Sequence, residues 1–285
     1  MTWLDQYRTS LKPISTEEPL DLFVYRPGGF IVAKLLQRTL FTPNHVTIAS
    51  MLCGVAAGVL YASGKSTTTF AAGIAFWIAN VLDCADGQLA RLKTTSSELG
   101  KILDGIADYV TGTAVLLGMA IGYSHAFTKP WMWWGLVAAA GVSNTIQSIL
   151  VDIHRNRFLA LSTAGSHTLE GEYEAFSEKH GRLERLSFGR MAIGMYRGYL
   201  RFAMTITKPK PIRIGPADRE QWVQKNRPVI RAWTLIGSST RISIAVFASL
   251  FNRPDLYLLA IVGPVNLAMA VLSLVQSRID SQGGD

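Results

Sequence analysis

The sequence predicts an all-α integral membrane protein with six membrane-spanning helices. Hydrophobic residues make up 49% of its 285 residues, and charged residues only 17%. The apolar residues gather into continuous blocks, without the periodic pattern of an amphipathic surface helix. Each block is close to the roughly 20 residues that a helix needs to cross the hydrocarbon of a bilayer. The predicted spans are 44–63, 68–90, 101–124, 131–152, 229–251 and 255–277.

The distribution of Lys and Arg predicts which side of the membrane each segment faces. With the N-terminus inside, the inside segments carry 24 of the 28 Lys and Arg residues, whereas the outside loops carry only Lys65, Lys129 and Arg253. Cytoplasmic segments are enriched in these residues. We therefore expect a multi-pass protein with both termini and the Asp83–Asp108 region on the cytoplasmic side. The net charge of +8 either attracts anionic lipid and a diphosphate substrate or only sets this topology.

The chain is predicted to form a single membrane domain over residues 1–285. Two segments outside the spans are expected to lie on the inner membrane surface as amphipathic helices, residues 28–38 and residues 186–206. No motif for nucleic-acid binding is recognisable, so no nucleic-acid partner is predicted. The domain divides into a juxtamembrane segment (1–43), spans 1 to 4 (44–152), a basic segment at the cytoplasmic face (153–228), and spans 5 and 6 with a tail (229–285).

Four aspartates stand close together in this otherwise apolar chain: Asp83, Asp86, Asp104 and Asp108. The first two are three residues apart and the last two are four apart, so each pair shares one face of a helix. An ionised carboxylate at membrane depth costs about 2–3 kcal/mol, and four together would also repel one another. The cluster therefore needs cations, and ligands that are all oxygen suit Mg²⁺, Mn²⁺ or Ca²⁺.

The spacing of these aspartates resembles the motif of a known enzyme family. The chain reads D-x2-D-G-x2-A-R-x8-G-x3-D-x3-D over residues 83–108, which fills every fixed position of the motif of CDP-alcohol phosphotransferases, also called CDP-alcohol phosphatidyltransferases. Residues 42–47, Thr-Pro-Asn-His-Val-Thr, are similar to the segment that opens the first spanning helix of that family. Residues 153–228 show no such resemblance. The resemblance implies a homodimeric membrane enzyme of phospholipid biosynthesis.

The resemblance also implies roles for the aspartates. Asp83, Asp86 and Asp104 would be metal ligands, and Asp108 would be a further ligand or the base that deprotonates the acceptor hydroxyl. We favour the role of general base for Asp108, and we also count Asp108 among the metal-binding residues. Two Mg²⁺ or Mn²⁺ ions would nearly balance four carboxylates and could clamp the attacked phosphate and the departing CMP.

Residues around the aspartates are predicted to bind the CDP-linked donor. By resemblance, Gly87 and Ala90 leave room for the nucleotide; the alternative is close packing of small residues between helices. Arg91 would pair with the diphosphate, or would only anchor the inner end of its span. An N-cap role is the alternative for Asn44. The predicted donor-binding set is Asn44, Thr47, Asp83, Gly87, Ala90, Arg91 and Gly100.

Three arginines are candidates for binding a phosphate group of the acceptor or of a lipid. Arg155 and Arg157 directly follow the fourth span, and Arg241 lies within the fifth. A charged residue inside a span is a functional candidate by default. The alternatives are snorkelling to the interface and a structural ion pair, for example with Asp152.

Two enzymatic reactions fit the motif equally, and both release CMP. In the first, CDP-diacylglycerol is the donor and a small polar alcohol is the acceptor. In the second, a CDP-linked polar head group is transferred to a lipid hydroxyl, as in diacylglycerol or a ceramide-like lipid. We favour the first, because cationic side chains near the inner end of the fourth span suit an anionic small acceptor. A non-catalytic ion-binding, lipid-binding or transport protein is the remote alternative.

Overall fold

The computed structural model describes residues 2–11, 13, 16–95, 97–126, 128–163, 173–174, 176–178, 188–207 and 219–282. These residues are almost all helical, and none of them forms a β-strand, which confirms the predicted all-α class. The principal helices are α1 (Trp3–Ser10), α2 (Arg26–Leu36), α3 (Pro43–Ala62), α4 (Ser66–Leu92), α5 (Glu98–Tyr123), α6 (Pro130–Thr163), α8 (Phe188–Thr207), α9 (Arg219–Thr234), α10 (Ser238–Leu250), α11 (Pro254–Ala260) and α12 (Asn266–Gln282).

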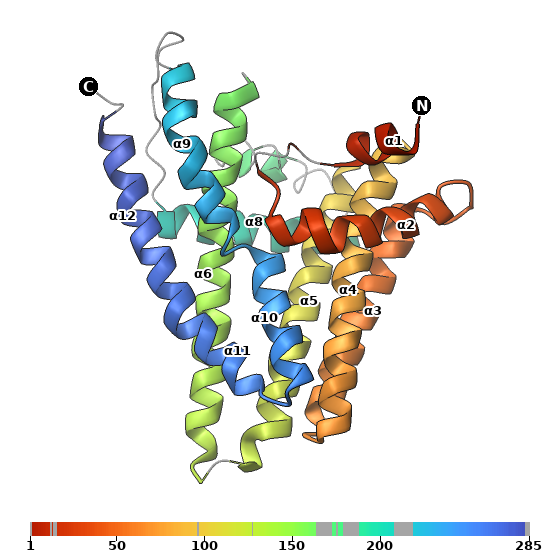
Figure 1. Ribbon diagram of the computed structural model, residues 1–285, viewed down its shortest axis with the longest axis vertical. Helices are drawn as coiled ribbons and strands as arrows, with labels where there is room; N and C mark the ends of the chain where they lie inside the picture. The colour runs from red at the N-terminus through yellow and green to blue at the C-terminus, as the bar shows by residue number, and fades with distance from the viewer. Residues whose placement is uncertain are drawn as a thin grey trace.

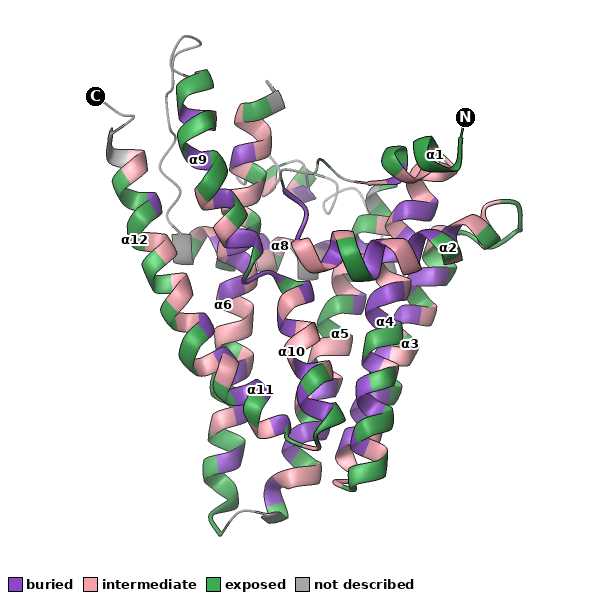
Figure 2. Cartoon of the chain, in the orientation of Figure 1, coloured by how far each residue is buried: buried purple, intermediate pink, exposed green. Residues whose placement is uncertain are grey.

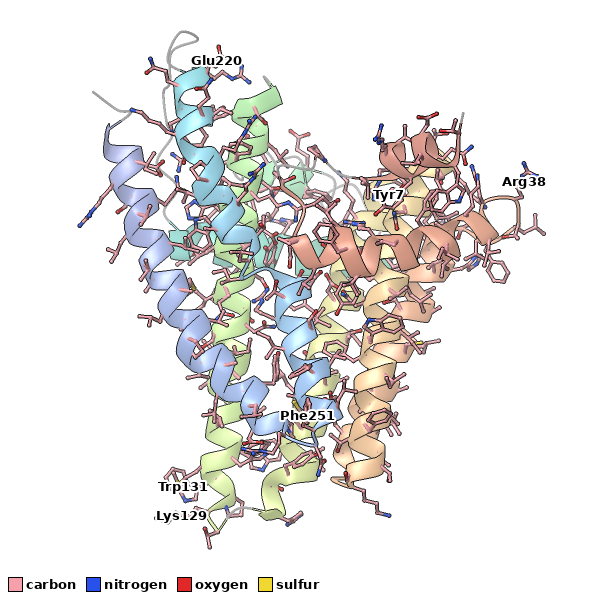
Figure 3. All side chains as sticks on the ribbon, in the orientation of Figure 1. Tyr7, Arg38, Lys129, Trp131, Glu220 and Phe251 are labelled. Carbon is pink, nitrogen blue, oxygen red and sulfur yellow. The ribbon has the colours of Figure 1, made fainter. Side chains whose placement is uncertain are left out.

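Five helical stretches are long and apolar enough to cross a membrane: Pro43–Ala62, Ser66–Leu92, Leu99–Tyr123, Pro130–Ser162 and Pro254–Asp280. They run roughly side by side, whereas α2 and α8 lie across them near one level (Figure 1). Both termini are at the same end of the bundle. Arg38 and Glu220 mark that end, and Lys129 and the exposed Trp131 mark the opposite one (Figure 3). This arrangement suits helices that span a bilayer with an aromatic residue at an interface.

The predicted fifth span, residues 229–251, is not a single helix. Helix α9 ends at Thr234 and α10 begins at Ser238, with Gly237 in an extended conformation as its N-cap. With 13 residues, α10 is about 20 Å long, which is less than the roughly 30 Å of bilayer hydrocarbon. The structure therefore supports five of the six predicted spans by length and composition and divides the predicted fifth.

The last predicted span, residues 255–277, does form one continuous stretch. It consists of α11, a π-helical turn at Ile261–Val265 and α12. Pro264 lies inside that turn. Proline has no backbone N–H and clashes with the preceding turn of an α-helix, which accounts for the local widening of the hydrogen-bond pattern.

Small residues bring α3 and α5 into close contact. A Cβ atom added to Gly58 would collide with the backbone carbonyl of Ala114, and one added to Gly118 would collide with the carbonyl of Gly58. Lipid chains are as apolar as leucine, so helices in a membrane associate through such close backbone packing. Large apolar side chains such as Leu52 and Leu274 are instead exposed on the outside (Figure 2). The outward faces therefore match a lipid environment.

Helix α2 packs across α4 at the end of the bundle that carries the aspartates. It coincides with the predicted surface helix of residues 28–38, although it begins two residues earlier, at Arg26. A Cβ atom on Gly29 would lie 3.0 Å from the backbone nitrogen of Ala85, so only glycine permits this approach. Helix α8 likewise coincides with the predicted helix of residues 186–206. The rest of the predicted cytoplasmic-face segment lies largely outside the described residues.

Candidate active site

Three of the four motif aspartates meet where α4 ends and α5 begins. Asp83 and Asp86 on α4 and Asp104 on α5 each offer an oxygen, and these oxygens all lie within 4.8 Å of one another. Helix α4 ends at Leu92, and α5 begins at Glu98. Ser97 caps α5 by accepting a hydrogen bond from the Gly100 amide at 3.0 Å. The i, i+3 spacing puts Asp83 and Asp86 on one face of α4, and Asp104 of the antiparallel α5 meets them there.

Asp108 extends the cluster along α5. It lies one turn beyond Asp104 and shares a small cavity with Asp83. The cavity lies between α3, α4, α5 and α10, and its polar lining comprises Ser50, Asn80, Asp83, Asp108 and Thr111. All four motif aspartates are therefore gathered at one place, as their spacing predicts. The donor set consists of carboxylate oxygens and fits a hard divalent cation such as Mg²⁺ or Mn²⁺.

A hydrogen bond ties α3 to this cluster. Thr47 Oγ1 donates to Asp86 Oδ2 at 2.5 Å, and both side chains are buried. The same hydroxyl lies 3.2 Å from the carbonyl of Pro43, one turn earlier. The sequence predicted that Thr47 contacts the donor; the structure shows its hydroxyl holding a carboxylate of the cluster.

Asn44 is not the N-cap of α3, so that alternative reading of Asn44 is wrong. The N-cap is Thr42, which exchanges hydrogen bonds with His45 in a capping box. Asn44 is exposed and already inside the helix. Its Oδ1 lies 3.3 Å from the position that a Cβ atom would occupy on Gly100, so these two donor-site candidates lie next to each other.

The surroundings of Gly87 favour clearance over helix packing. A Cβ atom added there would meet only the guanidinium of Arg91, whose nearest atoms are 3.5 Å away, and no atom of another helix. Ala90 is half-buried on the same helix. Arg91 donates through Nε to the carbonyl of Ser10, and its buried Nη2 has no hydrogen-bond partner among the described residues. An N–H pointing to no protein acceptor is available for an anionic ligand.

The structure separates the three candidate arginines. Arg241 is buried and donates to Asn144 O and Ser148 Oγ on α6, both at 2.7 Å, which ties α10 to α6. Arg157 forms an ion pair with Asp280 on α12 at 2.8 Å. The contact of Arg157 is a structural ion pair, although its partner is Asp280 and not the suggested Asp152. The contacts of Arg241 are hydrogen bonds to neutral groups of α6.

Arg155 differs from the other two. It is half-buried on α6, and its charge acts on Glu18 of the N-terminal segment. Among the three predicted acceptor-binding arginines, Arg155 is therefore the one for which the described residues show no hydrogen bond or ion pair with the protein.

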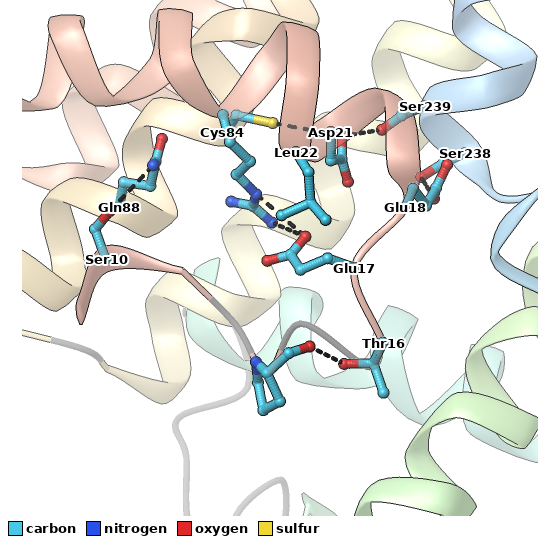
Figure 4. Close-up of polar contacts among 12 residues, drawn as sticks. Ser10, Thr16, Glu17, Glu18, Asp21, Leu22, Cys84, Gln88, Ser238 and Ser239 are labelled. Atoms are coloured by element: carbon cyan, nitrogen blue, oxygen red, sulfur yellow. Dashed lines mark hydrogen bonds and ion pairs between the residues drawn. The ribbon is translucent and has the colours of Figure 1, made fainter. Parts of the chain in front are cut away.

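An acidic network that the sequence analysis did not identify connects the N-terminal segment to α10 (Figure 4). Glu17 accepts hydrogen bonds from Arg26 at 3.2 and 3.3 Å, and Asp21 accepts one from Ser239 Oγ at 2.5 Å. All four side chains are buried. The acidic run Glu-Glu-Pro-Leu-Asp at residues 17–21 was the only sequence signal of this network. It does not reveal the partners, because Ser239, the partner of Asp21, lies more than 200 residues away in the sequence.

Glu18 occupies the N-terminus of α10 within this network. It accepts a hydrogen bond from the Thr240 amide at 3.1 Å, and its carboxylate lies where a Cβ atom of Gly237 would be. Burial, followed by the charge of Asp21, raises the pKa of Glu18 from 4.5 to about 7. Free N–H groups at a helix N-terminus stabilise an ionised carboxylate and so lower its pKa. At Glu18 this lowering only partly offsets the increase of the pKa that burial causes.

Comparison with known proteins agrees with this geometry. Residues 40–166 match the CDP-alcohol phosphatidyltransferase family. The chain is 31% identical over 118 residues to the bifunctional IPC transferase and DIPP synthase of Thermococcus kodakarensis, covering 41% of this chain and 24% of the relative. It is 28% identical over 120 residues to the phosphatidylinositol phosphate synthase of Mycobacteroides abscessus, covering 42% of this chain and 48% of that relative.

The chain therefore spans about a quarter and about half of the length of these two relatives. The matched segment begins just before α3, contains α4 and α5 with all four aspartates, and ends just beyond α6. It thus covers the whole carboxylate cluster. Residues 40–166 of this chain thus match the CDP-alcohol phosphatidyltransferase family over the segment that holds the four aspartates.

Proposed function

We propose that the protein is a metal-dependent CDP-alcohol phosphotransferase of phospholipid biosynthesis. It transfers a substituted phosphate group from a CDP-linked donor to an acceptor hydroxyl and releases CMP. The observation that carries this proposal is the convergence of Asp83, Asp86 and Asp104 within 4.8 Å on two antiparallel helices, next to a cavity that Asp108 lines.

The four aspartates hold the metal in this proposal. Asp83, Asp86 and Asp104 are its ligands, with Asp108 as a further one, and two Mg²⁺ or Mn²⁺ ions would balance their charge. When bound, these ions neutralise the diphosphate and stabilise the attacking and leaving oxygens. Thr47 keeps Asp86 in position through its hydrogen bond.

The donor nucleotide lies along α4 and the start of α5. Gly87, Ala90 and Gly100 leave room for it, and Arg91 binds the diphosphate through the N–H group that has no partner among the described residues. Asn44, beside Gly100, adds a polar group at the same edge. These contacts orient the phosphorus so that attacking and leaving oxygens are in line.

Asp108 acts as the general base. It lies beside Asp83, so an acceptor hydroxyl that reaches the carboxylate cluster can donate its proton to Asp108 as the oxygen attacks phosphorus. The bond from that oxygen to phosphorus forms, the bond to CMP breaks, and the proton stays on Asp108 until it returns to solvent.

The favoured substrates are CDP-diacylglycerol and a small polar alcohol. One relative is named phosphatidylinositol phosphate synthase, whose product joins a phosphatidyl group to a small phosphorylated alcohol. Arg155 is the best of the three arginines for binding an acceptor phosphate, because Arg157 and Arg241 are engaged within the protein. Transfer of a CDP-linked head group to diacylglycerol is the alternative.

The proposal extends to topology and assembly. Both termini and α2 lie at one end of the bundle (Figure 1), and α2 packs against α4 at Ala85, next to Asp86. In the proposal this end faces the cytoplasm, as the Lys and Arg distribution predicts. Helix α10 then serves as a short sixth transmembrane element, completed by the residues of α9. A homodimer is proposed from the family resemblance.

A panel assay tests the proposed reaction. Purified protein with Mg²⁺ is incubated with CDP-diacylglycerol and several small alcohols, and separately with CDP-linked head groups and diacylglycerol. Mass spectrometry resolves the products. CMP release that requires both a donor and an acceptor supports the proposal, and the productive pair assigns the lipid to donor or acceptor. Ion binding without CMP release from any pair would contradict it.

A further inference from the structure

The cavity beside Asp83 contains a buried polar group that the proposed reaction does not use. Asn80 is 6% exposed and lines this cavity, yet its Nδ2 has no hydrogen-bond partner of acceptable geometry among the described residues, although the Tyr25 hydroxyl lies beside it. That hydroxyl is paired with Ser243 at 2.7 Å. A buried amide N–H₂ without an acceptor is costly, so a ligand that supplies an acceptor oxygen would be favoured there.

The cavity lies nearer to the middle of the spanning helices than the aspartates do. On α4 and α5, a lining residue is about one turn, or about 5 Å, further toward the helix centre than an aspartate of the cluster. On α3, a lining residue is about one turn further in than Thr47, which holds Asp86. The pairs are Thr47 and Ser50 on α3, Asp83 and Asn80 on α4, and Asp108 and Thr111 on α5. The nucleotide candidates lie on the other side of the cluster, toward the connection between α4 and α5. The cavity is therefore on the hydrocarbon side of the reacting phosphate.

The lining of the cavity selects the chemistry of its ligand. Phe76, Ala79 and Ile242 supply apolar walls, and Ser50 donates its hydroxyl to the carbonyl of Ala79 at 2.8 Å. The carboxylates of Asp83 and Asp108 at its rim disfavour an anionic group. A neutral acceptor oxygen with apolar surroundings fits this description, and the ester carbonyl of a glycerolipid has that chemistry.

From this geometry we infer that Asn80 binds the lipid substrate by donating a hydrogen bond to an ester carbonyl of its glycerol backbone. The inference rests on the proposed function, because it places the lipid phosphate at the aspartate cluster. It holds whether the lipid is the donor or the acceptor, since either lipid must extend from the cluster toward the hydrocarbon. Asn80 thereby helps to distinguish ester-linked from ether-linked lipids.

The test compares two lipid substrates in the same assay, one with ester-linked and one with ether-linked chains on glycerol. The ether lipid lacks the carbonyl but keeps the chains and the head group. A neutral hydrogen bond corresponds to about a 2- to 13-fold effect. The wild-type protein should therefore prefer the ester lipid by about that factor in kcat/KM. Asn80→Ala should lose the preference, because its activity should fall more on the ester lipid than on the ether lipid.

A matched control separates this effect from loss of a buried amide. Asn226 is a buried asparagine on α9, hydrogen-bonded to Trp222 and Gln276 and outside the cavity. Asn226→Ala should affect both lipids equally and leave the ester preference intact. If Asn80→Ala lowers activity on both lipids equally, or if the wild-type protein shows no preference, the inference is wrong and Asn80 has a structural role or contacts the acceptor hydroxyl.

A binding measurement keeps the inference testable without turnover. Infrared spectra of a lipid with ¹³C-labelled ester carbonyls, bound to the wild-type protein, should show a band shifted to lower frequency by the hydrogen bond. Asn80→Ser and Asn80→Ala should reduce or abolish that shift. An unshifted carbonyl band in the wild-type complex would overturn the inference. A shifted band in a protein that releases no CMP would instead sustain the lipid pocket and refute the proposed reaction.

Discussion

Thr47 Oγ1 donates a hydrogen bond to Asp86 Oδ2 at 2.5 Å, so a residue of α3 holds a carboxylate of the cluster that α4 and α5 form. A hydrogen bond to a charged group contributes about 1.5–3 kcal/mol. Thr47→Val keeps the shape of the side chain but removes this donor, and should weaken Mg²⁺ binding about 10- to 100-fold. Isothermal titration calorimetry measures the affinity.

Thr47→Ser is the matched control for that change. It keeps the hydroxyl and should retain most of the wild-type Mg²⁺ affinity. Equal affinity of the valine and wild-type proteins would show that the hydrogen bond does not support the metal site. The sequence placed Thr47 at the site but assigned it to the donor, because motif position alone does not reveal which group a hydroxyl contacts.

Gly87→Leu should abolish CMP binding and leave metal binding largely intact. The position of its Cβ atom is open except for Arg91, so a large side chain would occupy the space proposed for the nucleotide. Ala90→Leu should behave in the same way. Calorimetry with CMP and with Mg²⁺ separates the two effects.

An exposed glycine on α6, Gly135, has no atoms within 4 Å of its Cβ position and provides the control. Gly135→Leu should bind CMP normally. If Gly87→Leu also binds CMP with unchanged affinity, the nucleotide does not lie against this face of α4.

The long helices and the gathering of the aspartates were predictable, because both follow from local patterns. Apolar blocks of about 20 residues predict spans, and an i, i+3 spacing puts Asp83 and Asp86 on one face. The break at residues 235–237 was not predictable in this way. Glu18 lies against Gly237 at this break and accepts a hydrogen bond from the Thr240 amide, and hydropathy does not reveal a contact between residues so far apart in sequence.

The arginines illustrate a second limit of sequence reasoning. A charge in an apolar block predicts function by default, yet Arg241 donates to a carbonyl and a hydroxyl of α6. Backbone carbonyls and neutral hydroxyls occur in every helix, so the sequence does not indicate which of them will bind an arginine. An acidic partner would have been easier to anticipate, as Arg157 shows with Asp280.

Glu18→Gln should make the protein less sensitive to pH between about 4.5 and 7. The pKa of Glu18 is raised to about 7 in the folded protein, so between its unfolded value of 4.5 and 7 the folded state binds more protons than the unfolded state. Folded stability therefore falls as pH rises through this range, by at most about 3 kcal/mol. Glutamine cannot ionise and should remove this loss.

Thermal unfolding in detergent at pH 5 and pH 8 measures the effect. The wild-type protein should lose more stability between these pH values than Glu18→Gln does. Glu178→Gln changes an exposed glutamate and serves as the control, with a pH dependence like that of the wild-type protein. A steeper loss in Glu18→Gln than in the wild type would contradict the raised pKa.

Turnover should require Mg²⁺ or Mn²⁺ and disappear when a chelator removes the metal. The cluster contains only carboxylate oxygens, which repel one another and also repel the anionic diphosphate. A divalent cation is needed to balance both charges. Ca²⁺ should bind but support turnover poorly, because its looser coordination positions the reacting oxygens less accurately. CMP release is measured after metal removal and after adding back each ion. Full turnover of a metal-stripped protein would refute the metal-dependent mechanism.

Asp108→Asn should remove turnover and preserve donor binding, whereas Asp83→Asn or Asp86→Asn should weaken metal and donor binding together. Asparagine keeps the shape of Asp108 but cannot accept the proton of the acceptor, so the loss should appear in kcat, at about 10²- to 10⁴-fold. Asp83 and Asp86 lie with Asp104 in the cluster and beside Gly87, where the metal and the diphosphate meet in the proposal. Single-turnover kinetics and separate donor-binding measurements on the three variants distinguish these roles. A near-normal kcat in Asp108→Asn would mean that another group takes the proton, and Asp108 would then be only a ligand or a wall of the cavity.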